Sequence, residues 1–464
     1  MARMQTPGTH ARGAPATDTV DHEVPRDLPR RGRSLPDGLR AFAHRDYRVF
    51  WFTQLLSLTG TWVQSLAQSW LVLTMTNSPA ALGLIGVCQF GPTLVLGLPA
   101  GVLVDRLPKR RLLIVTQVAS TAIIGVLALL VATGQVQLWQ IYAAAIALGV
   151  VSAVDMPARQ AFVVDLVGND DLMNAIALNS ALFNTTRVAG PALAGLLLAA
   201  FGPAICFILN AVSYLPVIVG LGMMRTIGWP RRGGEEGSPS ERLREGLAYV
   251  RSSPAVRMPI ILAGLMAIFG MNFGVWAPLL ARDALHIGAS GFGLLMSSLG
   301  VGSLIGALTL AFTRRRPSRR LMLGSALLFG TFEIALGVVA GMGLTAVLAM
   351  VLMAATGFAM STTMALANTA VQTSSPDWLR GRVTSIYLTV FAGSTPIGAA
   401  LAGFLSALWG APVAVAAGGA VVAAAVLAMG GRVTRIQRAR GAAHFGLILN
   451  VSSTTRRPVP DLPA

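Results

Sequence analysis

Two charged side chains stand inside apolar stretches of the sequence and are therefore the first candidates for chemistry. Arg187 lies within "ALFNTTRVAGPALAGLLLAAF" and Glu333 within "SALLFGTFEIALGVVAG". A guanidinium in such surroundings can bind an anion or join two helices in an ion pair, and a carboxyl can carry a proton or make a structural hydrogen bond. The sequence leaves both pairs of alternatives open.

The elements that hold these residues are predicted to be membrane-spanning helices. The chain has 464 residues, of which 54% are hydrophobic and 12% charged, and its mean hydropathy is +0.65. A helix needs roughly 20 apolar residues to cross about 30 Å of hydrocarbon, and about twelve such runs are present. We predict an all-α integral membrane protein with spans at 49–74, 81–103, 112–133, 138–163, 174–199, 203–224, 258–281, 290–312, 321–340, 344–370, 384–408 and 411–430.

Lys and Arg are concentrated in alternate gaps between the apolar runs. Of the 36 Lys and Arg residues, all but Arg187 and Arg282 fall on one side of the predicted membrane. Because Lys and Arg mark the cytoplasmic side, we expect a multi-pass protein of the cell membrane with both termini in the cytoplasm. The net charge of +17 then reflects contact with the lipid bilayer, and no nucleic-acid partner is predicted.

A charged stretch rich in Gly and Pro, at 225–257, divides the runs into two sets of six. It is too long for a tight helix connection, and Leu243, Leu247 and Val250 would share one face of a short amphipathic helix on the cytoplasmic membrane surface. Whether this segment is a linker or a regulatory element stays open. We expect a disordered cytoplasmic tail (1–48), an N-terminal six-helix bundle (49–224), the central loop (225–257), a C-terminal six-helix bundle (258–430) and a second cytoplasmic tail (431–464).

The two sets of runs repeat each other. A shift of 208 residues places Gly190 and Gly195 on Gly398 and Gly403, together with five further identical residues. Parallel repeats of this kind form two similar bundles related by an axis along the membrane normal, with a site between them near the midplane. We therefore expect a central cavity between the bundles.

One short gap, "GVLVDRLPKRR" at 101–111, combines a glycine, an acid and several cations. The glycine permits close helix packing, and the acid can accept hydrogen bonds from basic partners and helix N-termini. The cations would contact the anionic leaflet or act only as topology signals. The gap resembles the signature loop G-x-x-x-D-R-x-G-R-K of the major facilitator superfamily, with a proline in place of the second glycine. The matching residues are Gly101, Asp105, Arg106, Lys109 and Arg110.

The resemblance implies two six-helix bundles around a central cavity, with this loop latching the bundles together in the outward-facing state. A narrower resemblance covers "DMPARQAFVVDLVGNDDLMNAIALNSALF" from Asp155 and "RDYRVFWFTQLLSLTGTWVQSLAQSWLVL" from Arg45. It is to the drug:proton antiporter branch, which includes macrolide efflux proteins and the enterobactin exporter, and it implies export of a small molecule. Gly190, Pro191 and Gly195 resemble the antiporter motif of the fifth span, although a packing helix bent at a proline would use the same residues.

Polar side chains within the spans are candidates for the cavity. Gln64 and Gln68 belong to a polar stripe at helical spacing on the first span, and such a stripe must face a partner helix or a wet cavity. Spans 1, 4, 7 and 10 line the cavity in the superfamily. The resemblance therefore makes Gln64, Gln68, Asn272 and Asn368 candidate substrate contacts, with hydrogen bonding between helices as the alternative for each.

Asp155 and Arg159 stand four residues apart near the cytoplasmic end of the fourth span. This spacing lets an acid and a base pair on one face of a helix. We expect a charge network there, either as a plain surface pair or together with Asp105 and Arg106 of the loop.

Several classes of function are excluded. An ATP-driven pump needs a Gly-Lys phosphate-binding loop, but the single lysine, Lys109, follows a proline. The spans hold no paired acids and no His cluster, and Cys88 and Cys206 lack metal-ligand spacing, so we predict no enzyme, no cofactor and no metal site. We predict a monomeric secondary transporter that exports a moderately lipophilic drug, siderophore or secondary metabolite in exchange for protons. An ion-coupled importer and a non-transporting receptor or scaffold are the alternatives.

Overall fold

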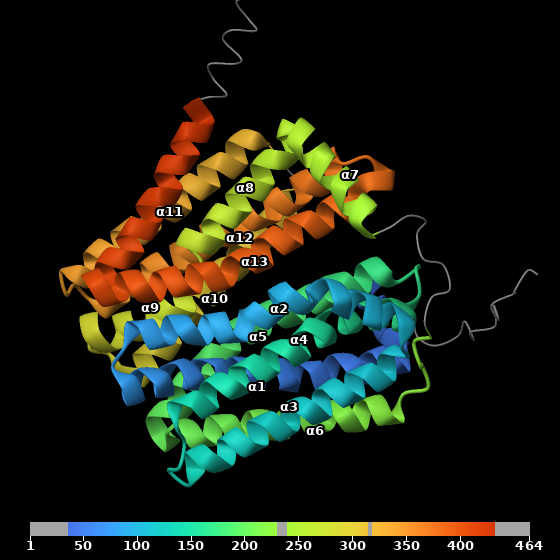
Figure 1. The fold of residues 1–464 in the computed structure, drawn as a ribbon, viewed down its shortest axis with the longest axis horizontal. Coiled ribbons are helices and arrows are strands. Elements are labelled where there is room, and N and C mark those ends of the chain that lie inside the picture. The colour runs from blue at the N-terminus through green and yellow to red at the C-terminus, as the bar shows by residue number, and fades with distance from the viewer. Residues whose placement is uncertain (1–35, 230–238, 314–317, 432–464) are drawn as a thin grey trace, which may run out of the picture.

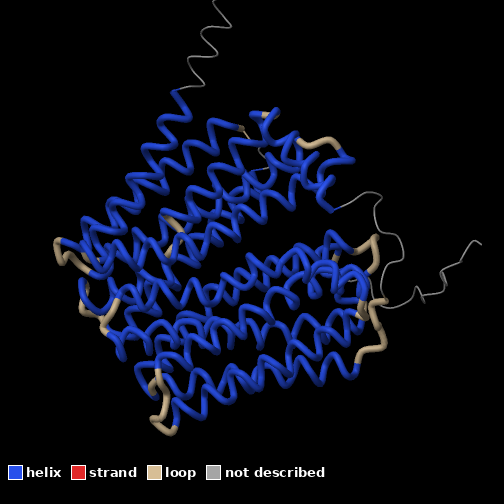
Figure 2. The backbone as a smooth tube through the Cα atoms, in the orientation of Figure 1, coloured by secondary structure: helices blue, strands red, loops and turns tan. Residues whose placement is uncertain are grey.

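Helices make up almost all of the described part of this protein (Figure 1). The computed structural model describes residues 36–229, 239–313 and 318–431, and no strand occurs in these ranges. The loops between the helices are short (Figure 2). Ten helices in these ranges are long and apolar enough to cross a membrane. The predicted all-α membrane fold is therefore confirmed.

The first long helices lie together in the lower half of Figure 1. A 3-10 helix, η1 (Asp37–Ala43), precedes them. Asn77, in the left-handed conformation, ends the first helix, and Pro79 opens the second at a position where a missing N–H costs nothing. The helices of this half are α1 (Arg45–Thr76), α2 (Pro79–Arg106), α3 (Lys109–Ala132), α4 (Leu138–Val167), α5 (Leu172–Phe201) and α6 (Pro203–Met223).

The remaining helices lie mostly in the upper half of Figure 1, with α9 and α10 near the middle of the view. The first span of this half is interrupted at 270–272, between α8 and α9. The elements of this half are α7 (Pro239–Ser252), α8 (Pro254–Phe269), α9 (Phe273–Leu279), the π-helix η2 (Leu280–Ala284), α10 (Gly288–Thr313), α11 (Arg319–Gly341), α12 (Ala346–Ser374), α13 (Asp377–Trp409) and a last helix at Ala411–Gly431.

Each predicted apolar run lies on one of these helices, the seventh on α8, α9 and η2 together. Several helices extend past the runs, because a helix continues into polar residues once it leaves the hydrocarbon; α13 begins at Asp377, not at 384. The expected disordered tail over 1–48 is wrong for residues 37–48, which form η1 and the start of α1. There Ala41 and Tyr47 are fully buried, so apolar packing orders them. Residues 1–35 and 432–464 of the two predicted tails lie outside the described residues.

The amphipathic helix predicted in the central loop is present as α7. Leu243 and Leu247 are exposed, whereas Val250 is buried. The Tyr249 hydroxyl donates a hydrogen bond to the Ser374 carbonyl at 2.8 Å. The helix therefore lies against the ends of α12 and α13.

The two halves meet through glycines on two equivalent helix pairs, α2 with α13 and α5 with α10. A Cβ atom on Gly403 would lie 2.8 Å from the Cα of Gly83, and one on Gly195 would lie 2.9 Å from the Cα of Gly293. Gly195 and Gly403 are matched by the shift of 208 residues that relates the halves in sequence. The repeat therefore appears in the structure as two like crossings, where the missing side chains let the backbones touch.

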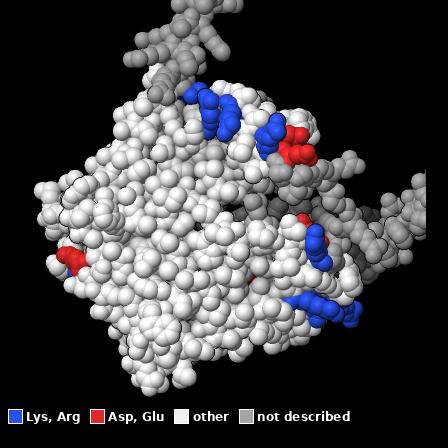
Figure 3. All heavy atoms as spheres, viewed as in Figure 1, with Lys and Arg blue, Asp and Glu red and all other residues white. Residues whose placement is uncertain are grey.

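The halves touch near one end of the molecule and separate toward the other. We call the end with the α2–α3 loop and α7 the basic end, because Lys and Arg gather there (Figure 3). At the opposite end, Arg282 donates to the Leu73 carbonyl at 2.9 Å, and the rings of Trp70 and Phe292 stack across the halves. Toward the basic end, a Cβ on Gly97 would meet nothing within 4 Å. Figure 3 shows the surface hollowed between the halves on this side.

Candidate functional site

Arg187 lies where the two halves converge. Its carbonyl oxygen faces Gly300 of α10, where an added Cβ would lie 2.6 Å away, and the next carbonyl, of Val188, accepts a hydrogen bond from Ser297 at 3.0 Å. The guanidinium reaches across to α12, with Nη2 4.0 Å from the Met360 sulfur. Arg187 is therefore a contact between halves at the closed end of the space that widens toward the basic end.

The antiporter-like motif forms the crossing just beyond Arg187. A Cβ on Gly190 would meet the Trp62 side chain of α1 at 2.5 Å. The Pro191 carbonyl and Gly195 lie against Gly293 of α10. These three residues thus allow α5 to fit closely between α1 and α10, and a role in exchange of protons for substrate stays a prediction.

Gln64 and Gln68 lie inside the N-terminal half, at 4% and 3% exposure. Gln64 donates to Gln68 at 2.8 Å and accepts from Asn210 of α6 at 2.7 Å. Asn210 also donates to the Tyr214 hydroxyl at 3.1 Å. The polar stripe on α1 therefore faces a partner helix, and substrate contact by either glutamine stays a prediction.

The charge pair on α4 has the predicted geometry. Asp155 accepts two hydrogen bonds from Arg159, at 3.0 Å from Nε and 2.5 Å from Nη2. Its other oxygen accepts from Thr116 at 2.7 Å and from Gln117 at 2.9 Å, both on α3. Asp155 is thus bonded to four donors on two helices. Within the described residues, no contact joins this pair to Asp105 or Arg106.

The loop motif divides into a tethered part and an exposed part. Lys109 is buried, with its ammonium 2.9 Å from an Asp165 oxygen at the end of α4, and Arg110 donates to the Gly222 carbonyl at 2.6 Å. Asp105 and Arg106 are exposed and have no ion-pair partner among the described residues. An added Cβ on Gly101 would meet nothing within 4 Å. Lys109 and Arg110 therefore hold the loop to its own half, and the Asp105 carboxylate stays accessible.

Glu333 on α11 is fully buried, and neither carboxyl oxygen has a hydrogen-bond partner in the described part of the chain. A Cβ on Gly270 would lie 3.1 Å from one of these oxygens, and one on Gly419 would lie 2.7 Å from the Glu333 Cβ. The carboxyl thus lies between the interruption of α8 and α9 and the last helix. Asn272, which begins α9, donates to the Ile268 carbonyl at 2.8 Å.

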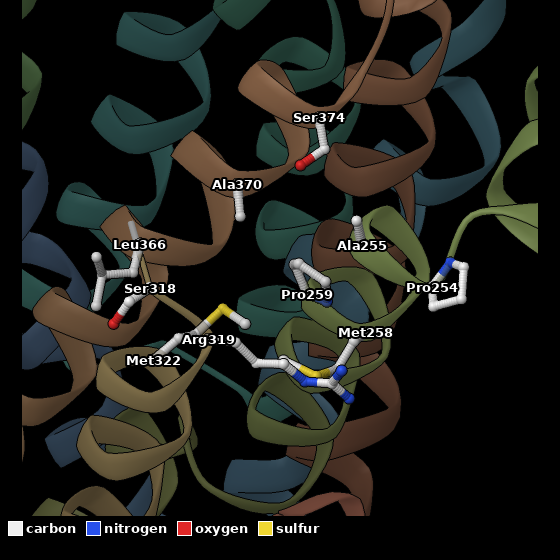
Figure 4. A pocket seen from close by; sticks show the side chains of 10 residues that line it. All are labelled: Pro254, Ala255, Met258, Pro259, Ser318, Arg319, Met322, Leu366, Ala370 and Ser374. Atoms are coloured by element: carbon white, nitrogen blue, oxygen red, sulfur yellow. The ribbon is translucent and has the colours of Figure 1, made fainter. Parts of the chain in front are cut away.

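Asn368 on α12 is partly exposed and accepts from the Gln372 amide at 3.1 Å. A separate pocket of about 260 Å³ lies between the basic ends of α8, α11 and α12. Its walls are mostly apolar, with the side chain of Arg319 across it (Figure 4). This pocket belongs to the C-terminal half alone and does not include Arg187.

Sequence reasoning missed the partners that complete these networks. Asn210 and Tyr214 stand four apart inside an apolar run, so their spacing could have identified them as a buried polar pair. Thr116 and Gln117 are adjacent polar residues inside another apolar run and could have been found by that position alone. No sequence signal identifies Met360, because a methionine in an apolar helix is usual.

A family model described as "transmembrane secretion effector" matches residues 37–446, nearly the whole chain. The chain belongs to this family of major facilitator transporters. Membership confirms the superfamily that the loop motif indicated, and it explains the paired helix crossings described above. These transporters are not enzymes, as the sequence predicted.

Relatives of this chain are transporters. The staphyloferrin A transporter of Staphylococcus aureus is 28% identical over 57% of this chain and 66% of that protein. The multidrug efflux pump Tap of Mycolicibacterium fortuitum is 26% identical over 76% of this chain and 88% of that protein. The enterobactin exporter EntS of Shigella boydii is 27% identical over 79% of this chain and 86% of that protein.

Solved structures share the fold of this chain. The nucleoside transporter NupG has a TM-score of 0.65 at 13% identity, covering 83% of this chain and 98% of that chain. At this level of identity the likeness shows the major facilitator fold alone.

Proposed function

We propose that this protein exports a small, moderately lipophilic molecule across the cell membrane by alternating access, in exchange for protons. The observation that carries the proposal is the one-sided contact between the halves, closed around Gly83 and Gly403 and open at the basic end. Such a space gives access to one side of a membrane only, which alternating access requires. Relatives named as efflux pumps and siderophore exporters support the outward direction.

The basic end faces the cytoplasm in this proposal, because Lys and Arg mark that side. Both termini then lie in the cytoplasm, and the protein works as a monomer in the bilayer with bundles at 49–224 and 258–430 moving against each other. The conformation is the inward-facing one. The exposed, unpaired Asp105 supports this assignment, since the loop motif latches the halves only in the opposite state.

Proton movement in proteoliposomes tests the proposal directly. Purified protein is reconstituted with a pH-sensitive dye inside, and lipophilic antibiotics and siderophores are added one at a time. Proton flux that depends on one compound, and that is absent from protein-free vesicles, is the expected result. A correctly inserted protein that moves no proton with any compound would contradict the coupling.

The variant Asp105→Asn separates the latch from the fold. Because Asp105 has no partner in the inward-facing state, its melting temperature should match that of the wild type. Loss of a charge-assisted contact in the other state should slow transport about tenfold. Asp170→Asn is the matched control, an exposed acid in the α4–α5 loop of the same end. Normal transport by well-expressed Asp105→Asn would remove the latch role.

A further inference from the structure

The side chain of Arg187 has an unusual lack of partners for a cation at this depth. A guanidinium has five N–H donors, yet its one hydrogen-bond acceptor among the described residues is the Met360 sulfur at 4.0 Å, a weak one. No carboxylate lies within ion-pair distance of it in that part of the chain. The side chain is only partly buried, so it borders open space.

The acids of the membrane interior are held elsewhere. Asp155 is bonded to Arg159 and to two donors of α3. Glu333 is enclosed against Gly270 and Gly419, with no surface exposed to the cleft. Neither α5 nor α12 carries an acid along its whole length. Among the described residues, Arg187 is therefore a fixed positive charge at the closed end of the cleft that no acid of the protein neutralises.

The helices that meet at Arg187 present mixed surfaces toward the basic end. On α5, Asn184 and Ser180 stand one and two turns away from Arg187, and both are at least partly exposed. On α12, Met364 and Asn368 stand one and two turns from Met360, also partly exposed. Residues at this spacing follow one side of a helix. An elongated molecule with one anionic end can therefore contact amides and a thioether along its body while its charge meets Arg187.

We propose that the exported substrate is an organic anion whose carboxylate pairs with Arg187 at the closed end of the cleft. The inference rests on the proposed transport function and names its substrate class. A carboxylate matches the planar donor fork of arginine in two parallel hydrogen bonds. A cationic drug in the same position would meet an uncompensated guanidinium and no acid, so the site discriminates by repulsion as well as by attraction.

Two dyes on one xanthene scaffold test the charge preference. Binding of carboxyfluorescein, an anion, and of tetramethylrhodamine methyl ester, a cation, is measured by fluorescence anisotropy on the purified protein. We expect the wild type to bind the anion more tightly. Arg187→Gln should weaken anion binding by at least about tenfold without weakening binding of the cation. Arg320→Gln, which removes an exposed charge at the start of α11, should leave both affinities unchanged.

A double variant distinguishes loss of the positive charge from misfolding of Arg187→Gln. Because Met360 contacts Arg187, the double variant Arg187→Gln with Met360→Lys returns a cation to the same place and should restore anion binding. Thermal melts of all variants report folding. An unchanged affinity for carboxyfluorescein in folded Arg187→Gln, or tighter binding of the cation by the wild type, would overturn the assignment.

Transport of the same dyes separates this inference from the proposed function. Proteoliposomes that export the cationic ester and leave carboxyfluorescein in place would keep the exporter and reject the anion site. Export of carboxyfluorescein that Arg187→Gln abolishes and the double variant restores would support both. Vesicles that move neither dye, despite normal insertion, would count against both proposals together.

Discussion

The two halves of the molecule repeat one helix plan but treat one acid of a long helix in each half, Asp155 and Glu333, in opposite ways. In the N-terminal half, Asp155 accepts four hydrogen bonds, and Gln64 lies in a continuous set of amides. In the C-terminal half, Glu333 has no partner for either oxygen, and the indole nitrogen of Trp276 is also without one, within the described residues. The repeat therefore preserves the packing of the helices and not the hydrogen bonding of these two acids.

This difference shows which of the two acids is stabilised by hydrogen bonds and which lacks them. A buried polar group without a hydrogen bond costs roughly 1–3 kcal/mol, so the Glu333 carboxyl carries a cost that the Asp155 carboxyl avoids. The cost lies beside the break between α8 and α9, where helix hydrogen bonds are already missing. Broken helices commonly form the substrate and ion sites of transporters. A role for Glu333 in carrying protons stays a prediction.

We expect the largest change in stability when the hydrogen bonds of Asp155 are removed. Asp155→Ala removes one carboxylate and takes away the acceptor shared by the partly buried Arg159 and the buried Thr116 and Gln117. We expect a loss of about 3–5 kcal/mol in the free energy of unfolding, measured by thermal or denaturant unfolding in detergent. Asp155→Asn, which keeps an oxygen acceptor, is the matched control and should lose less. Equal and small losses of unfolding free energy in both variants would show that the four hydrogen bonds of Asp155 contribute little to stability.

Substitution of Glu333, the acid without hydrogen bonds, should change the free energy of unfolding in the opposite direction. Glu333→Met keeps a side chain of similar length and removes a buried polar group that has no partner to leave behind. We expect the variant to gain about 1–3 kcal/mol in unfolding free energy, seen as a higher melting temperature. A loss comparable to that of Asp155→Ala would mean that Glu333 does have a strong partner. Proton-coupled export that persists in this variant would assign the proton to another group.

The smallest expected effect concerns Asp46, a hydrogen-bonded acid outside the predicted spans, and its contribution to the stability of the fold. Asp46 accepts hydrogen bonds from the Arg225 and Thr226 amides, both at 2.9 Å, and from the Thr226 hydroxyl at 3.0 Å. Burial raises the pKa of Asp46, but these hydrogen bonds and the charge of Arg45 outweigh it and hold the pKa below its ordinary value of 3.8.

A lowered pKa stabilises the fold above the ordinary value, and the contribution is lost as the pH falls through the lowered pKa. Asp46→Asn should therefore cost about 1 kcal/mol at neutral pH. The wild type and the variant should converge in acid, as followed by unfolding at a series of pH values. A difference that stays constant with pH would point to a packing effect in place of a charge effect.

The fold was predictable because its signals are local and additive. Apolar runs, alternate basic gaps and the shift between Gly195 and Gly403 each follow from chain composition at fixed spacing. The Asp155–Arg159 pair was predictable for the same reason, since both residues lie on one helix. The interruption at 270–272 was not predicted, because the run 258–281 is apolar apart from Asn272 and Gly270 resembles the many other helix glycines.

The charged residues of the site could be predicted from the sequence, but the residues that they contact could not. Arg187 and Glu333 stand out as charges in apolar sequence, but the side each one faces depends on helices far away in the chain. Met360 is 173 residues from Arg187, and Gly419 is 86 residues from Glu333. Contacts over such separations are set by the arrangement of whole helices, which the pattern of a single helix does not contain.

The glycine crossings near one end of the long helices have a mechanical consequence. Gly83 lies close to the start of α2, and Arg106 ends it, so at 1.5 Å per residue they are about 35 Å apart. A tilt of about 10° around Gly83 therefore displaces the other end by about 6 Å. A backbone contact of this kind acts as a fulcrum beside a long lever. A wide opening at the basic end thus needs only a small rocking motion, with every hydrogen bond inside the helices left intact.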